Sequence, residues 1–218
     1  MADDVTDPRG RLERLRLVAL RWPAPTGAQP WPVLFSGCLA GLKCGVDATD
    51  YGPHPLMERL CALPSVRVVR FCPEDAALGT PRGTPDLSGG DGRAVLDGRA
   101  RVVMDDGRDV TAPLLTAAHQ MVELARREQV CFAVLMDMSA LCGTQVVSDG
   151  PRLVKERKYQ RGLGVAAAAL DRAGIPVVAQ RDRFTLDALL EVLDPHGPRL
   201  IDDVLDHHER DWYRQEFG

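Results

Sequence analysis

Val130-Cys131-Phe132-Ala133-Val134-Leu135 is a continuous apolar run in the middle of the chain. A run of this kind, without polar alternation, is typical of a strand buried on both faces of a parallel sheet. Three more runs predict companion strands, at Trp31–Ser36, Val66–Phe71 and residues 176–179. The central part of the fold is therefore expected to be one sheet built from these four strands.

Helical patterns lie between these runs. The clearest one starts at Thr111, the expected cap, has Pro113 in its first turn and continues with apolar residues at 3.6-residue spacing. Shorter helices are expected at residues 55–62, 164–173 and 185–193. Strands that alternate with helices predict an α/β fold, here a single Rossmann-like domain with a mostly parallel sheet flanked by helices.

Two features interrupt this alternation. Residues 78–92 are rich in Gly, Pro and Asp and predict a loop. Short runs at residues 94–96 and 100–104 flank Asp97-Gly98, a pair that supplies the positive φ angles of a two-residue turn. These runs predict a small hairpin inserted at the edge of the sheet.

The chain of 218 residues is long enough for one substantial core with additions at both ends. We divide it into an N-terminal extension (1–30), the α/β domain (31–195) and a C-terminal tail helix (196–218). An apolar face on the tail predicts a helix that either docks on the domain or joins two copies in a homodimer. The residues on the two terminal faces are Leu12, Leu15, Val18 and Ala19 in the extension and Ile201, Val204 and Leu205 in the tail.

Composition excludes several classes of function. The net charge of −4 and a pI near 5.7 provide no basic field for a long nucleic acid, so we expect a small-molecule substrate. The apolar stretch near the start, residues 17–20, is too short for a signal peptide or a membrane span. We therefore expect a cytoplasmic protein without membrane contact, whose six cysteines are thiols or metal ligands rather than disulfides.

Three cysteines follow three of the expected strands. Cys38 comes after the strand at residues 31–36, Cys72 directly after the strand at 66–71, and Cys142 in the loop beyond the run that ends at Leu135. The carboxyl ends of parallel strands meet at one edge of a sheet, where open α/β sheets bind their ligands. A thiolate-lined metal site is therefore predicted at this edge. Cys61 and Cys131 fall in an expected helix and strand, and we assign them to packing.

Polar residues accompany these thiols. Glu74 follows the second thiol by two residues and is placed for acid–base chemistry, while Arg82 suits an anionic substrate group. The alternative for these two residues is a surface ion pair. Ser139 precedes the third thiol by three residues, where it either passes a proton or caps the next segment. The loop from Ser36 to Cys44 spaces two cysteines more widely than zinc knuckles or ferredoxin motifs do.

The ordered set of motifs resembles the DUF523 family, which includes the thiouracil desulfidases. The resemblance covers residues 33–180 and implies an α/β enzyme with a [4Fe-4S] cluster held by only three cysteines. In that family the open iron takes sulfur from a thiocarbonyl, such as that of 4-thiouracil, and carries it as hydrosulfide without net redox change. The matching motifs are Ser36-x-Cys38-Leu39-x-Gly41-x-x-Cys44, Cys72-Pro73-Glu74 with Pro81-Arg82, Gly107-Arg108-Asp109-Val110-Thr111, Ser139-x-x-Cys142-Gly143 and Gly162-x-Gly164-Val165.

Carried over position by position, the resemblance implies a role for each residue of the site. Glu74 and Ser139 would handle the water and protons of hydrolysis. The substrate would contact Arg82 and Ser36. The implied cluster ligands are Cys38, Cys72 and Cys142, with Cys44 as the alternative ligand or as a thiol beside the cluster.

Departures from the family pattern mark a divergent member. Gly45-Val46-Asp47-Ala48 stands where the family usually has Arg-Tyr-Asp-Gly, Met136-Asp137 replaces Lys-Glu, and Gln180 replaces Glu. Because these changes leave the thiols intact, they bear on substrate identity rather than on cluster binding. The alternatives are sulfur transfer in the reverse direction on another substrate, a non-catalytic iron–sulfur redox or sensor protein, and an α/β protein with structural thiols and an ordinary nucleotide pocket.

The histidines add little to the prediction of the site. His54, His119 and His196 are isolated in the sequence, and we interpret each as a surface or core residue. His207-His208-Glu209 resembles a metal cluster only superficially. We expect this stretch to belong to the tail helix.

Overall fold

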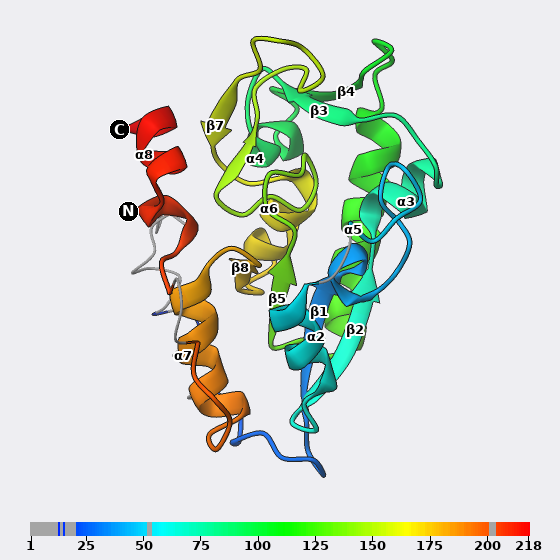
Figure 1. Ribbon diagram of the computed structural model, residues 1–218. Coiled ribbons are helices and arrows are strands. Elements are labelled where there is room, and N and C mark those ends of the chain that lie inside the picture. Colours follow the sequence, from blue (N-terminus) through cyan, green and yellow to red (C-terminus); the bar gives the residue numbers. More distant parts are fainter. Residues whose placement is uncertain (1–12, 14, 16–20, 52–53, 201–203) are drawn as a thin grey trace.

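The computed structural model describes residues 13, 15, 21–51, 54–200 and 204–218. A four-stranded parallel sheet lies at its centre, with helices on both faces (Figure 1). The predicted α/β fold is therefore confirmed, and each of the four strands expected in the sheet forms within two residues of its expected bounds. In spatial order the strands are β2 (Val66–Phe71), β1 (Trp31–Ser36), β5 (Phe132–Leu135) and β8 (Val177–Ala179).

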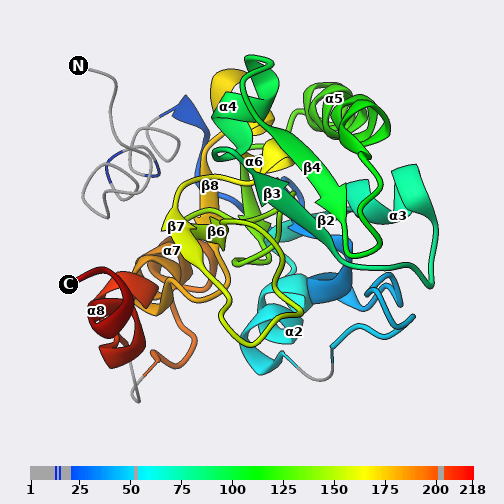
Figure 2. The same cartoon turned by 90° about the horizontal axis from the view of Figure 1, so that it is seen from above.

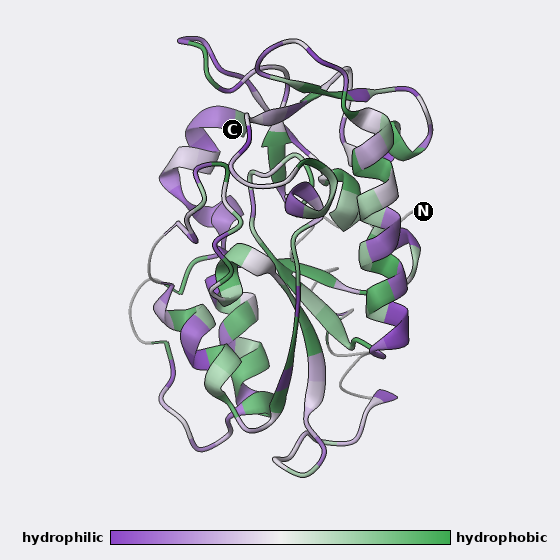
Figure 3. Ribbon diagram, turned by 90° about the vertical axis from the view of Figure 1, so that its right-hand side faces the viewer, coloured by the Kyte–Doolittle hydropathy of each residue, from purple (hydrophilic) through white to green (hydrophobic). Residues whose placement is uncertain are grey.

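The sheet separates two hydrophobic cores because alternate side chains of each strand point to opposite faces. On β1, Leu34 enters one core, whereas its neighbours Val33 and Phe35 enter the other. Figure 3 shows hydrophobic residues along the central strands and hydrophilic ones on the outer sides of the helices. The first core includes residues of α5 (Thr111–Arg127) and α6 (Val165–Arg172), and the second includes residues of α2 (Pro55–Ala62) and α7 (Arg183–Leu193).

Short elements form a layer beyond the carboxyl ends of the strands (Figures 1 and 2). The predicted hairpin around Asp97-Gly98 is wrong: its second strand forms as β4 (Arg101–Met104), but this pairs antiparallel with β3 (Pro85–Ser88), and a helix lies between them. Residues 94–96, predicted as a strand, belong instead to α4 (Gly92–Leu96), because the carboxylate of Asp91 caps that helix by accepting from the Arg93 and Ala94 N–H groups. The stretch at residues 78–92, predicted as a loop, contains β3.

Further short elements complete this layer. They are α3 (Pro73–Leu78), β6 (Val146–Ser148) and β7 (Tyr159–Arg161), and β6 pairs antiparallel with β7. At the start of α5, Val110 is the cap and Thr111 the first helical residue, one position earlier than expected. The Thr111 hydroxyl accepts instead from the Val102 N–H and so ties α5 to β4.

The C-terminal tail contains a 3-10 turn, η2 (His207–Glu209), and a short helix, α8 (Asp211–Phe217). Val204 and Leu205, assigned to an apolar helical face, precede both elements and are 36% and 42% exposed. Ile201 and most of the N-terminal face lie outside the described residues, although Leu15 is buried. Across the described residues, the helices all fall short of the length and apolar character that a bilayer crossing needs.

Candidate functional site

Four cysteines line one cavity of about 440 Å³ at the carboxyl edge of the sheet. Cys38 lies in η1 (Gly37–Ala40), Cys44 in the loop that follows, Cys72 at the end of β2 and Cys142 in the loop after β5. The structure thus brings the three strand-end thiols together and adds the fourth. Cys131 does not line this cavity.

Two glycines allow the first loop to fold closely around the thiols. A Cβ atom at Gly37 would lie 2.9 Å from a Leu42 methyl, 3.1 Å from Cys44 Sγ and 3.4 Å from Cys72 Cβ. Gly41 adopts φ +83°, a left-handed conformation that favours glycine, and the Leu42 N–H then donates to the Gly37 carbonyl at 2.9 Å. This turn directs the chain back so that its second cysteine faces the cavity.

Cys72 sits at the junction of β2 and α3. Its Sγ accepts a hydrogen bond from the Asp75 N–H at 3.4 Å and lies 3.8 Å from the Cys44 carbonyl oxygen. Pro73 occupies the first turn of α3, where its missing N–H costs nothing. The sequence Cys-Pro-Glu therefore places a thiol at the cavity and starts the helix that carries Glu74.

Three of the cavity thiols, Cys44, Cys72 and Cys142, resist ionisation because their pKa values are raised. The hydrogen bond from Cys38 is the main cause that raises the pKa of Cys44 to about 12, and burial adds to it. The pKa of Cys72 is raised by its hydrogen bond with Cys44 and by burial, and that of Cys142 by burial and by the nearby Cys72. A cationic centre in the cavity would reverse these effects, because it stabilises thiolates.

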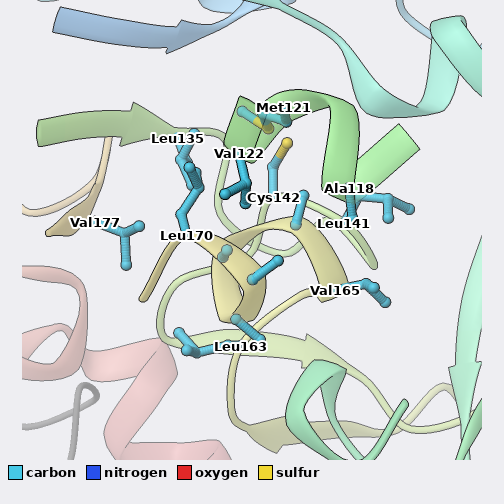
Figure 4. Close-up of a cluster of buried hydrophobic side chains, with 14 of the residues drawn as sticks. Ala118, Met121, Val122, Leu135, Leu141, Cys142, Leu163, Val165, Leu170 and Val177 are labelled. Carbon is cyan, nitrogen blue, oxygen red and sulfur yellow. The ribbon is translucent and has the colours of Figure 1, made fainter. Parts of the chain in front are cut away.

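The third thiol sits between the cavity and the core. Figure 4 shows Cys142 next to Leu141 and near Met121 of α5, within the hydrophobic cluster that covers one face of the sheet. Ser36 lies close by at the end of β1, where its Oγ accepts from the Met136 N–H at 3.0 Å. Within the described residues, no three His, Cys, Asp or Glu side chains converge as a single metal ion requires.

A chain of polar contacts crosses the cavity beside the thiols. Ser139 Oγ donates to Glu74 Oε1 at 2.9 Å, and Arg82 donates to the other oxygen of the same carboxylate at 2.8 Å. Ser139 Oγ also accepts from the Leu141 and Cys142 N–H groups at 3.1 and 3.0 Å. These two donors leave the Ser139 proton directed at Glu74. The side chains of Glu74 and Arg82 are only 13% and 4% exposed, so their pair is not the surface ion pair of the alternative interpretation.

The Arg82 guanidinium binds acceptors of the protein itself. Besides Glu74, its guanidinium donates to the carbonyl oxygens of Cys44 and Gly79 and to the Thr80 hydroxyl. The role of Arg82 in substrate binding stays a prediction, and its contacts favour a role in holding Glu74. Ser36, the other residue assigned to the substrate, is 1% exposed and lines the cavity.

Other residues of the cavity wall were not singled out from the sequence. Tyr51 lines the cavity. Asp137 and Gln180, both noted only as departures from the family pattern, line it too, and Gln180 accepts from the Asp137 N–H at 2.7 Å. His54 also lines it, although its place in the sequence gave no sign of this. Asp137 contacts His207, which lies far away along the chain. Local sequence carries no signal for such long-range contacts.

The comparisons with known proteins agree with this geometry. A family model described as 2-thiouracil desulfurase matches residues 33–182. The chain is 30% identical over 152 residues to the uncharacterized protein YbbK of Bacillus subtilis (strain 168), which covers 69% of this chain and 96% of YbbK. Among solved structures, the [4Fe-4S]-dependent thiouracil desulfidase TudS (DUF523Vcz) matches with a TM-score of 0.60 and 28% identity, covering 74% of this chain and 98% of that chain.

These matches confirm the resemblance to the thiouracil desulfidases that the motifs indicated. The matched residues include the sheet, all four cavity thiols, Glu74 and Ser139. They support an enzyme of the desulfidase type. The chain therefore belongs to the 2-thiouracil desulfurase family.

Proposed function

We propose that this chain hydrolyses the C=S group of a thiolated nucleobase, nucleotide or similar small molecule to C=O, using a [4Fe-4S] cluster. The observation that carries the proposal is the hydrogen bond from Ser139 to Glu74 at a cavity walled by four thiols. A metal centre without acid–base chemistry has no need of such a pair. The cofactor is supported by TudS, a structural relative whose printed name describes it as [4Fe-4S]-dependent.

The donor set fits an iron–sulfur cluster. Thiolates are the usual protein ligands of such clusters, and four thiols line this cavity, of which Cys44, Cys72 and Cys142 have raised pKa values to which contacts with neighbouring thiols contribute. We assign the cluster to Cys38, Cys72 and Cys142, because each follows its own strand, and leave Cys44 as a neighbouring thiol. When bound, a cluster with three protein ligands supplies an open iron that acts as a Lewis acid for the soft sulfur of the substrate.

Glu74 and Ser139 then supply the proton transfers. Arg82 donates to the Glu74 carboxylate at 2.8 Å, and this contact orients Glu74 as the base. As a water molecule attacks the thiocarbonyl carbon, Ser139 passes a proton from that water to Glu74 Oε1, and Glu74 returns one to the departing sulfur. The C=S bond is replaced by C=O, one water is consumed and hydrogen sulfide leaves, so no oxidant or reductant is needed.

The cavity suits a small planar substrate. Its volume of about 440 Å³ is in the range of ligand pockets, and Tyr51, Met136 and Met138 give it flat or adaptable apolar surfaces. A ring of the size of a nucleobase can reach the thiols from the side of these residues. Because the site depends on reduced thiols, we propose that the enzyme works in the cytoplasm.

The test is a measurement of iron and acid-labile sulfide on protein reconstituted without oxygen. The wild type is expected to bind about four of each per chain. The variants Cys38→Ala, Cys72→Ala and Cys142→Ala are expected to lose the cluster, while Cys44→Ala keeps it. Cys131→Ala, which removes a buried thiol outside the cavity, is the matched control and keeps it as well.

Each other outcome has a definite meaning. A wild type that binds no iron, or a control that loses as much iron as the three ligand variants, contradicts the proposal. Loss of iron in Cys44→Ala as well would indicate four protein ligands and favour the electron-transfer alternative, because no iron would then be open to substrate.

A further inference from the structure

We propose that His207 and Asp137 form a positioning pair, through which the C-terminal tail holds the loop that carries Ser139 and Cys142. The kinetic consequence of this inference rests on the proposed function, whereas the structural one does not. Neither residue is assigned to the reaction itself. Asp137 acts through the loop, and His207 acts through Asp137.

Asp137 closes the loop that follows β5. One carboxylate oxygen, Oδ1, accepts from the N–H groups of Thr144, Gln145 and Val146 at 2.9, 3.1 and 3.3 Å. Residues 137 and 144–146 are thereby joined, and Ser139 lies within the closed segment between them. The orientation of the Ser139 hydroxyl toward Glu74 therefore depends on this carboxylate.

His207 satisfies the second oxygen of the same carboxylate. Its Nδ1 lies 2.7 Å from Asp137 Oδ2, and the two side chains are 2% and 0% exposed. Trp212 stacks on the imidazole with ring centroids 5.3 Å apart and an interplanar angle of 14°, which fixes the plane of the ring. A buried carboxylate that lost this partner would have to find water or move, and the loop would move with it.

The tail is anchored on both sides of His207. Asp206 accepts from the Phe184 and Thr185 N–H groups at 2.8 and 3.2 Å, which joins the tail to the start of α7. Beyond the imidazole, Arg161 of β7 donates to the Phe217 carbonyl oxygen at 2.9 Å. The position of His207 is thus fixed by contacts outside the cavity, as expected for a residue that orients a site without touching the substrate.

The pair lies partly outside the region shared with the family. The family match ends at residue 182, so Asp137 falls inside it and His207 outside it. A segment beyond the matched region therefore supplies a contact to the cavity wall. We infer that the tail is a functional part of this enzyme and not only a covering for the sheet.

The experiment compares two variants of one residue by hydrogen exchange and by kinetics. In the metal-free protein, His207→Ala is expected to speed exchange of the amides of residues 144–146 at least tenfold. His207→Asn is expected to restore slow exchange, because the asparagine amide nitrogen takes the position of the imidazole Nδ1. Arg214→Ala, which removes an exposed side chain of α8, is the control and leaves these amides unchanged. Thermal melts confirm that each variant is folded.

The kinetic part uses cluster-loaded enzyme and 2-thiouracil. His207→Ala is expected to lower kcat about tenfold with little change in KM, as is typical when a supporting partner of a site is lost, and His207→Asn to recover most of it. Unchanged exchange in His207→Ala, or equal effects of His207→Ala and Arg214→Ala, would overturn the inference. If no variant and no wild type acts on thiouracil, the proposed function fails, while the exchange data still decide whether the pair holds the loop.

Discussion

The two walls of the cavity are built in different ways. The wall after β2 carries Glu74, which is held by Arg82 from the neighbouring loop, eight residues further along the chain. The wall after β5 carries Ser139, whose loop is closed by Asp137, and this residue depends on His207, 70 residues away. The Glu74 carboxylate is thus held by a local contact, whereas the loop with the Ser139 hydroxyl is closed by a residue that contacts the far end of the chain. Changes to the two walls should therefore have different consequences.

The largest effect is expected where the two walls meet. Ser139→Ala removes the hydroxyl between Glu74 and the substrate, and kcat for thiouracil should fall by about 10²–10⁴ because proton transfer is lost. Iron content should remain that of the wild type, since the thiols are untouched. Ser88→Ala in β3, outside the cavity, serves as the control. A kcat within threefold of the wild type would remove Ser139 from the reaction.

The next effect concerns the stability of the wall after β5, which carries Ser139. Asp137→Asn leaves His207 and three N–H groups without their anionic partner in a buried site, and the free energy of unfolding should fall by about 3–5 kcal/mol. Urea denaturation measures it. Asp97→Asn, which breaks exposed ion pairs with Arg99 and Arg172, should cost less than about 1 kcal/mol. Equal losses in the two variants would show that the wall after β5 has no special dependence on Asp137.

A smaller loss of activity is expected from a change in the wall after β2, which carries Glu74. Arg82→Lys keeps the positive charge but cannot span Glu74 and three other acceptors at once, so kcat should fall about 10–100-fold while the fold persists. Arg108→Lys, in an exposed ion pair, is the control. If the Arg82 variant instead raised KM alone, the arginine would contact the substrate, as the sequence had led us to predict.

The smallest effect is a dependence of stability on pH. Burial opposes ionisation of Asp137, but the hydrogen bond and charge of His207 and the N–H groups of Thr144 and Gln145 outweigh it and lower its pKa below the ordinary value of 3.8. A carboxylate with a lowered pKa stabilises the folded state above its ordinary pKa and loses this contribution as the pH falls below it. The difference in unfolding free energy between wild type and Asp137→Asn should therefore shrink as the pH falls below about 4. A constant difference would contradict this account.

The regular part of the fold was predictable because its signals are local. The strand Trp31–Ser36 and the helix Pro55–Ala62 form at their expected bounds, since apolar runs and Pro punctuation act over a few residues. The convergence of Cys38, Cys72 and Cys142 also followed from the sequence, because parallel strands bring their carboxyl ends to one edge.

The irregular layer was predicted less well. Residues 92–96 become a helix through the Asp91 cap, although their apolar run also fits a strand, and β3 starts at a proline and holds a buried Asp86 paired with Arg152. The capping pattern Asp206-x-x-Glu209 could have identified the turn of the tail. Nothing local, however, shows that His207 within that turn meets a carboxylate 70 residues earlier.

The most direct test of the central claim is a product analysis with cluster-loaded wild type and cluster-loaded Ser139→Ala. Incubation with 2-thiouracil under anaerobic conditions should yield uracil and sulfide in equal amounts, over many turnovers and without added reductant, in the wild type alone. The two proteins should carry the same iron content. A wild type that holds its full iron content but releases neither uracil nor sulfide would contradict hydrolysis of a thiolated nucleobase at this site.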